Sequence, residues 1–312
     1  MQLEGVHHVT AITGDAPRNV EFYAGVLGLR LVKKTVNQDD PTVYHLFYAD
    51  EKGSAGSDIT FFEYPGVPPG RAGDGMVHRV LFRVAASEAL DFWQERLEHE
   101  GVATERLDRS LLFSDPEGLD LGLVIDTSND DRLRAEHPEI PLDFALLGFD
   151  GVRAYSSAPA RSAAFFEQGL GFNPRGDGEW EVRGERRGGY YAFDDAPDAR
   201  PLSGAGTVHH VAWASPMGDH AGWRGRVIAA GGAATPIIDR YYFRSVYFRE
   251  PSGVLFEIAT LGPGFTADEA IETLGQALSL PPNYEHLRDK LKEVLTPLPD
   301  PRERARAGSR GG

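Results

Sequence analysis

Two histidine doublets, each flanked by valines, are the residues of this chain with the clearest capacity for chemistry. Residues 5–11 read GVHHVTA, and residues 207–213 read TVHHVAW. Imidazole nitrogens bind divalent metals and titrate near neutral pH, so a repeated doublet suits a metal site or proton transfer. A single histidine in a strand is usually structural. The interpretation therefore depends on what accompanies the two doublets.

A carboxylate late in the chain joins the doublets. Glu257 lies within the apolar segment GVLFEIAT, where a buried carboxylate is costly unless it is paired or bound to a cation. His8 and His210 occupy matching places in a repeated unit, and Glu257 lies on a strand of the same unit as His210. Two imidazoles and one carboxylate form a facial triad that leaves open positions on an ion. Such a set suits Fe(II), and Mn(II) or Zn(II) also accepts these ligands.

The other member of each doublet is expected to face away from the ion. Side chains alternate across a strand, so His7 and His8 should point to opposite faces, as should His209 and His210. His7 and His209 would then support the ligands from outside or line another part of the cleft.

Two further side chains are weaker candidates for the site. His45, in VYHLFYAD, can line the cavity of the first repeated unit. Glu63, in FFEYPG, ends a strand-like run and is interpreted as solvated, with a role as a fourth ligand as the alternative.

The elements that must position these residues recur four times along the chain. The first unit has a strand at 6–13, a helix at 15–28 and three more strand-like runs, which gives the order β-α-β-β-β. The order begins again near 76, 149 and 207, and SDPEGLDLGL at 114–123 matches REPSGVLFEI at 249–258. Each unit has a sheet with one covered face, so units must pair to bury their apolar sides.

Pairing of the units predicts an α+β fold in which four βαβββ modules form two half-barrel domains around clefts. The expected division is an N-terminal domain at 1–130 with modules 1 and 2, a linker at 131–147, and a C-terminal domain at 148–262 with modules 3 and 4. Residues 263–296 are expected to form a helical tail of two amphipathic helices parted by Pro281 and Pro282. Residues 297–312 are expected to be disordered.

The composition limits the classes of partner. The 312 residues are 41% hydrophobic, which is enough for two cores, and contain no cysteine, which excludes disulfides and favours the cytoplasm. A net charge of −15 disfavours binding to nucleic acid or to an anionic membrane. No apolar run has the length of a membrane span, and the opening residues lack a secretory pattern. The expected partner is a small molecule, and a homo-oligomer is left open.

The ordered set of motifs resembles one superfamily. The βαβββ repeats with His…His…Glu are similar to the vicinal oxygen chelate proteins, which include glyoxalase I, bleomycin-resistance proteins and extradiol dioxygenases. The doublets, YHLFYAD, DRYYFRSVYFREPSGVLFEIAT and GFTADE narrow the resemblance to hydroquinone-type ring-cleaving dioxygenases, the dichlorohydroquinone dioxygenase type. The resemblance runs over nearly the whole chain.

The resemblance implies a site and a reaction. It implies Fe(II) held by His8, His210 and Glu257, and the opening of an aromatic diol with O₂. It also implies polar residues around the open face of the metal, by position His7, Thr10, His209, Arg240 and Tyr247. Among these, a His or Tyr can move the phenol proton, and the Arg240 cation can stabilise an oxyanion. An ordinary ion pair of Arg240 with Asp239 or Glu250 is the structural alternative.

Two other functions remain open from the sequence. A glyoxalase-like isomerase or lyase with Zn(II) or Ni(II) would want a second carboxylate ligand, for which Glu63 is at hand. A metal-free binding protein of the resistance type would not need Glu257 inside an apolar strand. The dioxygenase is ranked first.

Overall fold

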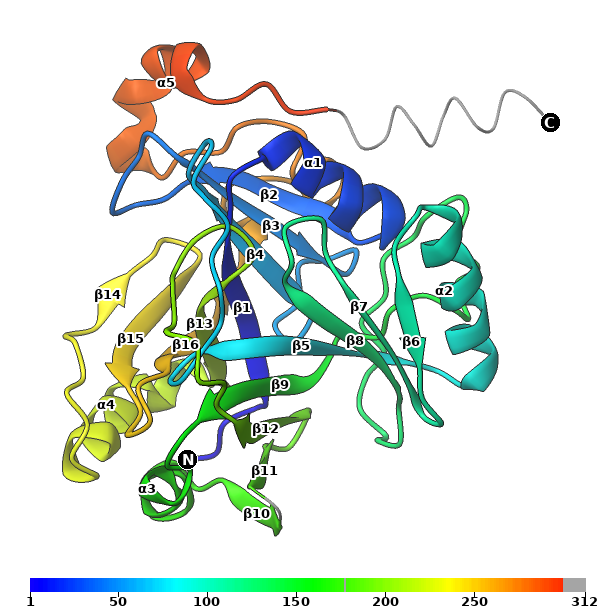
Figure 1. Ribbon diagram of the computed structural model, residues 1–312. Coiled ribbons are helices and arrows are strands. Elements are labelled where there is room, and N and C mark those ends of the chain that lie inside the picture. Colours follow the sequence, from blue (N-terminus) through cyan, green and yellow to red (C-terminus); the bar gives the residue numbers. More distant parts are fainter. Residues whose placement is uncertain (177, 300–312) are drawn as a thin grey trace.

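A computed structural model describes residues 1–176 and 178–299 and has two eight-stranded sheets (Figure 1). The strand order is β14-β15-β16-β13-β1-β4-β3-β2 in the first sheet and β10-β11-β12-β9-β5-β8-β7-β6 in the second. The predicted α+β fold with four βαβββ modules is confirmed. The prediction of disorder at 297–312 falls mostly on residues 300–312, which lie outside the described residues.

The two sheets divide the strands as follows. The first contains β1 (Val6–Thr13), β2 (Arg30–Val36), β3 (Tyr44–Ala49), β4 (Asp58–Glu63), β13 (Val208–Ser215), β14 (Ile238–Asp239), β15 (Phe243–Arg249) and β16 (Leu255–Pro263). The second contains β5 (Val77–Val84), β6 (Thr104–Arg106), β7 (Ser110–Ser114), β8 (Asp120–Ile125), β9 (Phe149–Ser156), β10 (Asn173–Gly176), β11 (Glu179–Arg183) and β12 (Gly188–Asp195).

One helix follows the first strand of each module. These helices are α1 (Ala16–Val20), α2 (Ser87–His99), α3 (Ala160–Ala164) and α4 (His220–Ala229). α1 and α3 continue as π-helical turns at Glu21–Val26 and Phe165–Leu170, and a 3₁₀ turn at Met217–Asp219 precedes α4. Asp15 caps α1, as its residue type suggests, because its carboxylate accepts a hydrogen bond from the Arg18 backbone N–H at 3.1 Å.

The modules pair differently from the expected domains. Module 1 shares a sheet with module 4, because β1 pairs antiparallel with β13, and module 2 shares a sheet with module 3 through β5 and β9. Figure 1 shows the resulting neighbours, with the dark blue β1 beside β13. Residues 1–130 and 148–262 therefore each contribute to both sheets. Repetition reveals the modules, but it carries no information about which copies become neighbours.

The predicted helical tail is present, with one α-helix in place of the two expected. One short α-helix is present, α5 (Arg288–Val294), preceded by 3₁₀ turns at Phe265–Ala267, Ile271–Thr273 and Pro282–Leu287. The first of the two expected helices is replaced by irregular chain that lies against β2. Gly275 has a φ of +74°, and a Cβ there would lie 1.8 Å from the Leu31 carbonyl oxygen, so this close approach requires glycine.

A buried lysine holds the tail on the first sheet. Lys33 of β2 is fully buried, and its ammonium contacts the carboxylates of Asp268, at 2.8 Å, and Glu269. The Tyr242 hydroxyl donates to Asp268 at 2.9 Å, so the tail also contacts the loop between β14 and β15. The tail is therefore a packed part of the first sheet.

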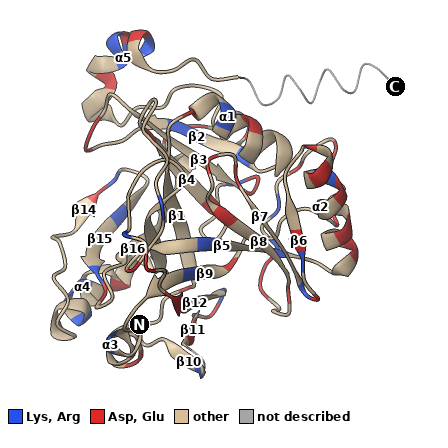
Figure 2. Ribbon diagram, in the orientation of Figure 1, with Lys and Arg blue, Asp and Glu red and all other residues tan. Residues whose placement is uncertain are grey.

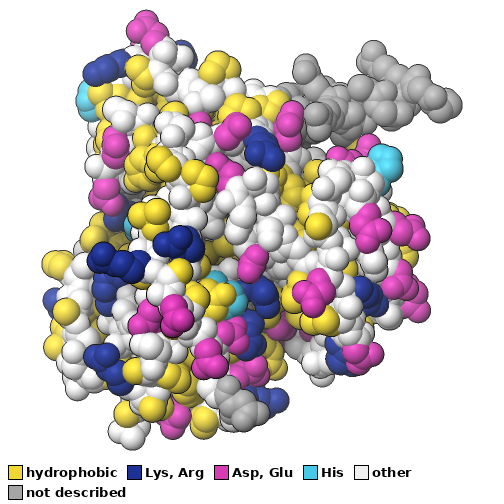
Figure 3. All heavy atoms as spheres, viewed as in Figure 1, with side chains coloured by type: hydrophobic (Ala, Val, Ile, Leu, Met, Phe, Trp, Pro, Cys, Tyr) yellow, Lys and Arg dark blue, Asp and Glu magenta, His cyan; other side chains and the backbone are white. Residues whose placement is uncertain are grey.

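The surface carries both signs of charge. Acidic side chains are frequent on α2 (Figure 2), and basic and acidic groups are intermixed on the face shown in Figure 3. Among the described residues, no helix combines the length and apolar character that a membrane crossing requires.

Candidate metal centre

Both histidine doublets lie at β-bulges where β1 and β13 meet. The register of the two strands shifts at His7 on β1 and again at His209 on β13. A bulge adds one residue to a strand and redirects its side chains. The rings within each doublet therefore touch, with Nδ1–Nδ1 distances of 2.9 Å for His7 and His8 and 2.8 Å for His209 and His210. The expectation that the members of a doublet point to opposite faces is wrong, because it assumed unbroken alternation.

His8, His210 and Glu257 come together in the first sheet. The His8 Nε2 and His210 Nε2 atoms are 3.2 Å apart, and they lie 3.2 and 2.9 Å from one carboxylate oxygen of Glu257. The three side chains are 1%, 4% and 0% exposed. They form a group of possible ligands from β1, β13 and β16.

The spacing and surroundings of these donors fit a divalent ion. Ligands at right angles around an ion, with bonds of about 2.1 Å, lie about 3.0 Å apart. Within the described residues, Glu257 Oε1 has no hydrogen-bond partner, and Oε2 faces only the two Nε2 atoms, although the side chain is fully buried. A buried carboxylate with so few partners is costly, and a bound cation would reduce that cost.

The outer histidines can fix the protonation of the inner ones. A ligand nitrogen at Nε2 leaves the proton of His8 on Nδ1, from which it can donate to Nδ1 of His7. His7 Nε2–H in turn can donate to the Thr260 carbonyl oxygen at 3.1 Å. His210 has the same relation to His209. The Nε2 lone pairs of His8 and His210 are thus both available to one ion beside Glu257.

Burial lowers the pKa of two histidines of this cluster. It lowers the pKa of His210, partly offset by Glu257, and together with His8 it lowers the pKa of His7 to about 3. Burial also opposes the charged form of Glu257, but the two ligand histidines outweigh it and hold the pKa of this carboxyl well below its usual range. The group therefore offers an ionised carboxylate beside two imidazole nitrogens.

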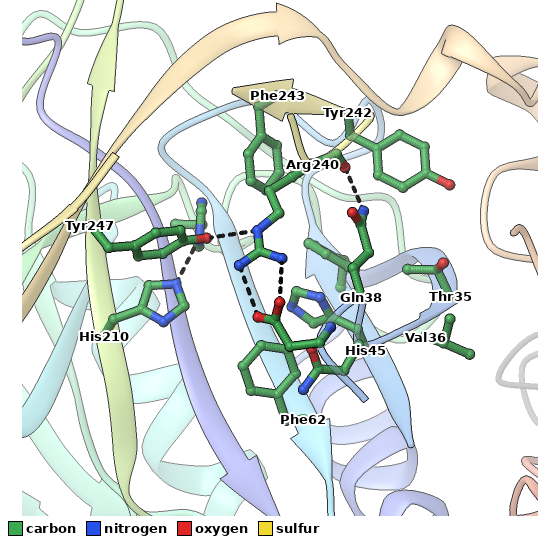
Figure 4. A pocket seen from close by; sticks show the side chains of 14 residues that line it. Thr35, Val36, Gln38, His45, Phe62, His210, Arg240, Tyr242, Phe243 and Tyr247 are labelled. Carbon is green, nitrogen blue, oxygen red and sulfur yellow. Dashed lines mark hydrogen bonds and ion pairs between the residues drawn. The ribbon is translucent and has the colours of Figure 1, made fainter. Parts of the chain in front are cut away.

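Two of the three donors reach a cavity of the first sheet (Figure 4). His8 and His210 belong to its wall. Aromatic rings supply much of the rest, namely Phe47, Phe62, Tyr242, Phe243 and Tyr247. The cavity therefore suits a flat aromatic molecule with a polar group directed at the histidines.

Arg240 and Tyr247 lie together in this wall. The Arg240 Nε–H donates to the Tyr247 hydroxyl at 3.3 Å, and the guanidinium makes a two-point ion pair with Asp39 at 2.9 and 3.0 Å. The expected partners Asp239 and Glu250 are not the ones observed. Asp39 lies on the loop between β2 and β3. Nothing in the sequence linked Asp39 to Arg240, because these two residues become neighbours only when modules 1 and 4 pair.

The other candidate site residues, Thr10, His45 and Glu63, lie at different distances from the centre. Thr10 touches the centre, with its hydroxyl 3.0 Å from His210 Nε2, and His45 lines the cavity. Glu63 lies outside the ligand group and is 2% exposed, so its interpretation as a solvated strand end is wrong. Its carboxylate lies near the start of α1, where it accepts a hydrogen bond from the Ala16 N–H at 3.4 Å. The sequence interpretation missed Thr60, which links Thr10 to His45.

Comparison with known proteins gives the family. The sequence model of the glyoxalase/bleomycin resistance protein/dioxygenase superfamily matches residues 5–120 and 148–258. The chain belongs to this superfamily. The resemblance drawn from the motifs is thereby confirmed.

Curated relatives of this superfamily member span its length. A Bacillus subtilis (strain 168) protein named "Putative ring-cleaving dioxygenase MhqA" is 38% identical, covering 96% of this chain and 100% of the relative. The "Chlorohydroquinone/hydroquinone 1,2-dioxygenase" of Sphingobium indicum is 31% identical, covering 94% of this chain and 96% of the relative.

Solved structures agree with the fold. A crystal structure described as a "putative dioxygenase from Bacillus subtilis" superposes with a TM-score of 0.89 at 38% identity, covering 96% of this chain and 98% of that one. Glyoxalase I from Zea mays matches with a TM-score of 0.55 at 14% identity, covering 82% of this chain and 92% of that one, which shows a shared fold.

Proposed function

We propose that the chain is an Fe(II)-dependent ring-cleaving dioxygenase of the extradiol type, which opens a hydroquinone or related aromatic diol with O₂. The observation that carries the proposal is the meeting of His8, His210 and Glu257 in one group, two members of which line an aromatic cavity. The names of the full-length relatives support the same reaction class.

The residues of the chain would divide the work. His8, His210 and Glu257 would hold the ion, and the aromatic wall would orient the ring. Fe(II) in a facial triad supplies open positions where a substrate oxygen and O₂ can meet, so that electrons pass from ring to oxygen. Arg240 and Tyr247 lie in the same wall and can stabilise negative charge on the ring oxygen or hold its proton.

The alternatives receive less support. A glyoxalase-like isomerase or lyase would want a second carboxylate, and the ligand group formed by the described residues contains only Glu257. A metal-free binding protein would leave that carboxylate fully buried with one oxygen unpaired among the described residues. Mn(II) and Zn(II) are the second choices of ion. A cytoplasmic location and a homo-oligomer stay predictions.

Anaerobic loading tests the proposal. The protein is loaded with Fe(II) under argon and mixed with hydroquinone, and O₂ uptake is followed with an electrode while the product is identified by mass spectrometry. We expect about one O₂ consumed for each ring opened. His210→Ala should abolish both signals. Failure of the wild-type protein to retain iron, or O₂ uptake that His210→Ala leaves unchanged, would contradict the proposal.

A further inference from the structure

A line of hydrogen bonds crosses the first sheet from the cavity wall to the candidate metal centre. His45 Nε2 lies 2.9 Å from the Thr60 hydroxyl, which lies 2.8 Å from the Thr10 hydroxyl, which lies 3.0 Å from His210 Nε2. The four residues come from β3, β4, β1 and β13, which are neighbours in that order in the sheet. Thr10 and Thr60 are fully buried.

The bonds of this line run in one direction. The Thr60 hydroxyl donates its single hydrogen to Thr10, so it must accept at its contact with His45. The Nε2 of His45 is therefore the protonated nitrogen and donates to Thr60. Since the Thr10 oxygen already accepts from Thr60, the hydrogen of Thr10 is free to point at the centre.

Metal binding changes the acceptor of this last hydrogen. Without an ion, the Thr10 hydroxyl can donate to the lone pair of His210 Nε2. The same lone pair is the one that His210 would use as a ligand, so the hydroxyl must then find another oxygen or nitrogen at the centre. Rotating the Thr10 side chain away from the centre would break its hydrogen bond with Thr60. Rotation would therefore cost free energy, because buried polar groups would be left unsatisfied.

We propose that His45 is a positioning residue, which acts through Thr60 to hold the Thr10 hydroxyl as a hydrogen-bond donor to the phenolic oxygen of the aromatic substrate. This inference rests on the proposed function, because it assumes a phenolic substrate at the centre. It adds a specific role to a half-buried histidine held between the rings of Phe47 and Phe62, with centroid distances of 4.0 and 4.4 Å.

The position of Thr60 supports a role at the centre. Thr60 is paired with Thr10, two residues after His8, and Glu257 is paired with Ala212, two residues after His210. Thr60 thus occupies in module 1 the place of the metal-facing carboxylate of module 4. The paired modules therefore place a ligand at one of these positions and a hydrogen-bonding hydroxyl at the other.

The test separates the line of hydrogen bonds from the metal site. His45→Phe keeps a ring between Phe47 and Phe62 but removes the donor, and Thr60→Val keeps the shape of the side chain but removes the hydroxyl. Thr60→Ser restores the hydroxyl and is the matched control. Each protein is titrated with Co(II), followed by visible absorption, and the Co(II)-loaded protein is then titrated anaerobically with phenol.

We expect Co(II) affinity within about threefold of wild type in every variant, and phenol affinity about tenfold weaker in His45→Phe and Thr60→Val. Thr60→Ser should recover most of the phenol affinity. With Fe(II) and hydroquinone, the two disabling variants should also lose about 10- to 100-fold in kcat, with Thr60→Ser close to wild type.

Three outcomes would overturn the inference. The first is unchanged phenol affinity in both disabling variants. The second is an equal loss in Thr60→Ser, which would indicate disturbed packing. The third is a loss of Co(II) affinity, which would show that the hydrogen bonds stabilise the metal ligands instead of positioning Thr10 for the substrate. Phenol binding that follows the expected order without any oxygen uptake would contradict the proposed function alone, whereas a wild-type protein that does not bind phenol would contradict both.

Discussion

At the scale of single residues, one inserted position in each strand creates the arrangement of the centre. In a regular strand His7 would lie on the face opposite His8, but the bulge lets the two rings share a hydrogen bond. A ligand histidine held in this way has a fixed tautomer and orientation, which raises metal affinity.

Replacing His7 tests this support. In His7→Phe the ring contact with Phe243 can remain, but His8 Nδ1–H loses its acceptor. We expect Mn(II) affinity, measured by calorimetry, to fall by about 10- to 100-fold. His7→Asn offers an amide oxygen near the position of Nδ1 and should bind more tightly than His7→Phe. Equal affinity in wild type and His7→Phe would show that the doublet does not support the ligand.

Glu257 allows a matched pair of charge removals. Glu257→Gln keeps the shape of the ligand but removes its charge, so bound Fe(II) after dialysis, measured by atomic absorption, should fall by about 100-fold or more. Glu63→Gln, at another buried carboxylate, should keep its iron. Iron loss in Glu63→Gln instead would favour the glyoxalase-like ligand set.

At the scale of elements, the second sheet repeats the architecture of the first, but its described residues form no His-His-Glu group. The bulge recurs on β5 at His78 and on β9 at Asp150. His78, however, lies 2.8 Å from Asp194, and Asp194 also pairs with Arg153 at 2.6 Å. In the second sheet the bulge thus positions an ion pair between strands.

This ion pair predicts a pH dependence of stability. Hydrogen bonds from Arg153, followed by His78, hold the pKa of Asp194 at about 2, below its ordinary value. The stabilisation is therefore complete above about pH 4 and is lost as the pH falls toward 2. Asp194→Asn should unfold about 1 kcal/mol more easily in urea at pH 7, and its difference from wild type should shrink at pH 3. Asp198→Asn, at an exposed position, should show little difference, and a constant gap for Asp194→Asn would refute the linkage.

The limits of prediction also lie at this scale. Repeated segments revealed the four modules and the matching places of His8 and His210, because local patterns record both. The bulges escaped notice, since one extra residue in a strand leaves the apolar pattern almost unchanged. Thr60 and Asp39 were missed because a threonine in a strand and an aspartate in a loop carry no signal before the modules pair. The roles of the eight predicted site residues stay predictions.

At the scale of the whole molecule, ion pairs of Lys33 with Asp268 and Glu269 hold the tail on the first sheet, which contains the candidate metal centre. Lys33→Met removes the buried cation and leaves two carboxylates facing its place, so urea unfolding should show a loss of about 3 kcal/mol. Limited proteolysis should then cut first within 264–299. Lys292→Met, at a side chain that is 60% exposed, should change stability by less than about 0.5 kcal/mol. A tail that stays resistant in Lys33→Met would disprove this role of the ion pairs.

The pairing of module 1 with module 4 governs when the protein can become active. β1 is synthesised before β13, which follows about two hundred residues later, and it completes its hydrogen bonds only with that strand. Until then its unfilled edge is exposed to other chains, a state in which aggregation competes with folding. A nascent or prematurely terminated polypeptide that ends before Glu257 has no complete set of donors, so an ion held by these three residues could bind only after synthesis has passed Glu257.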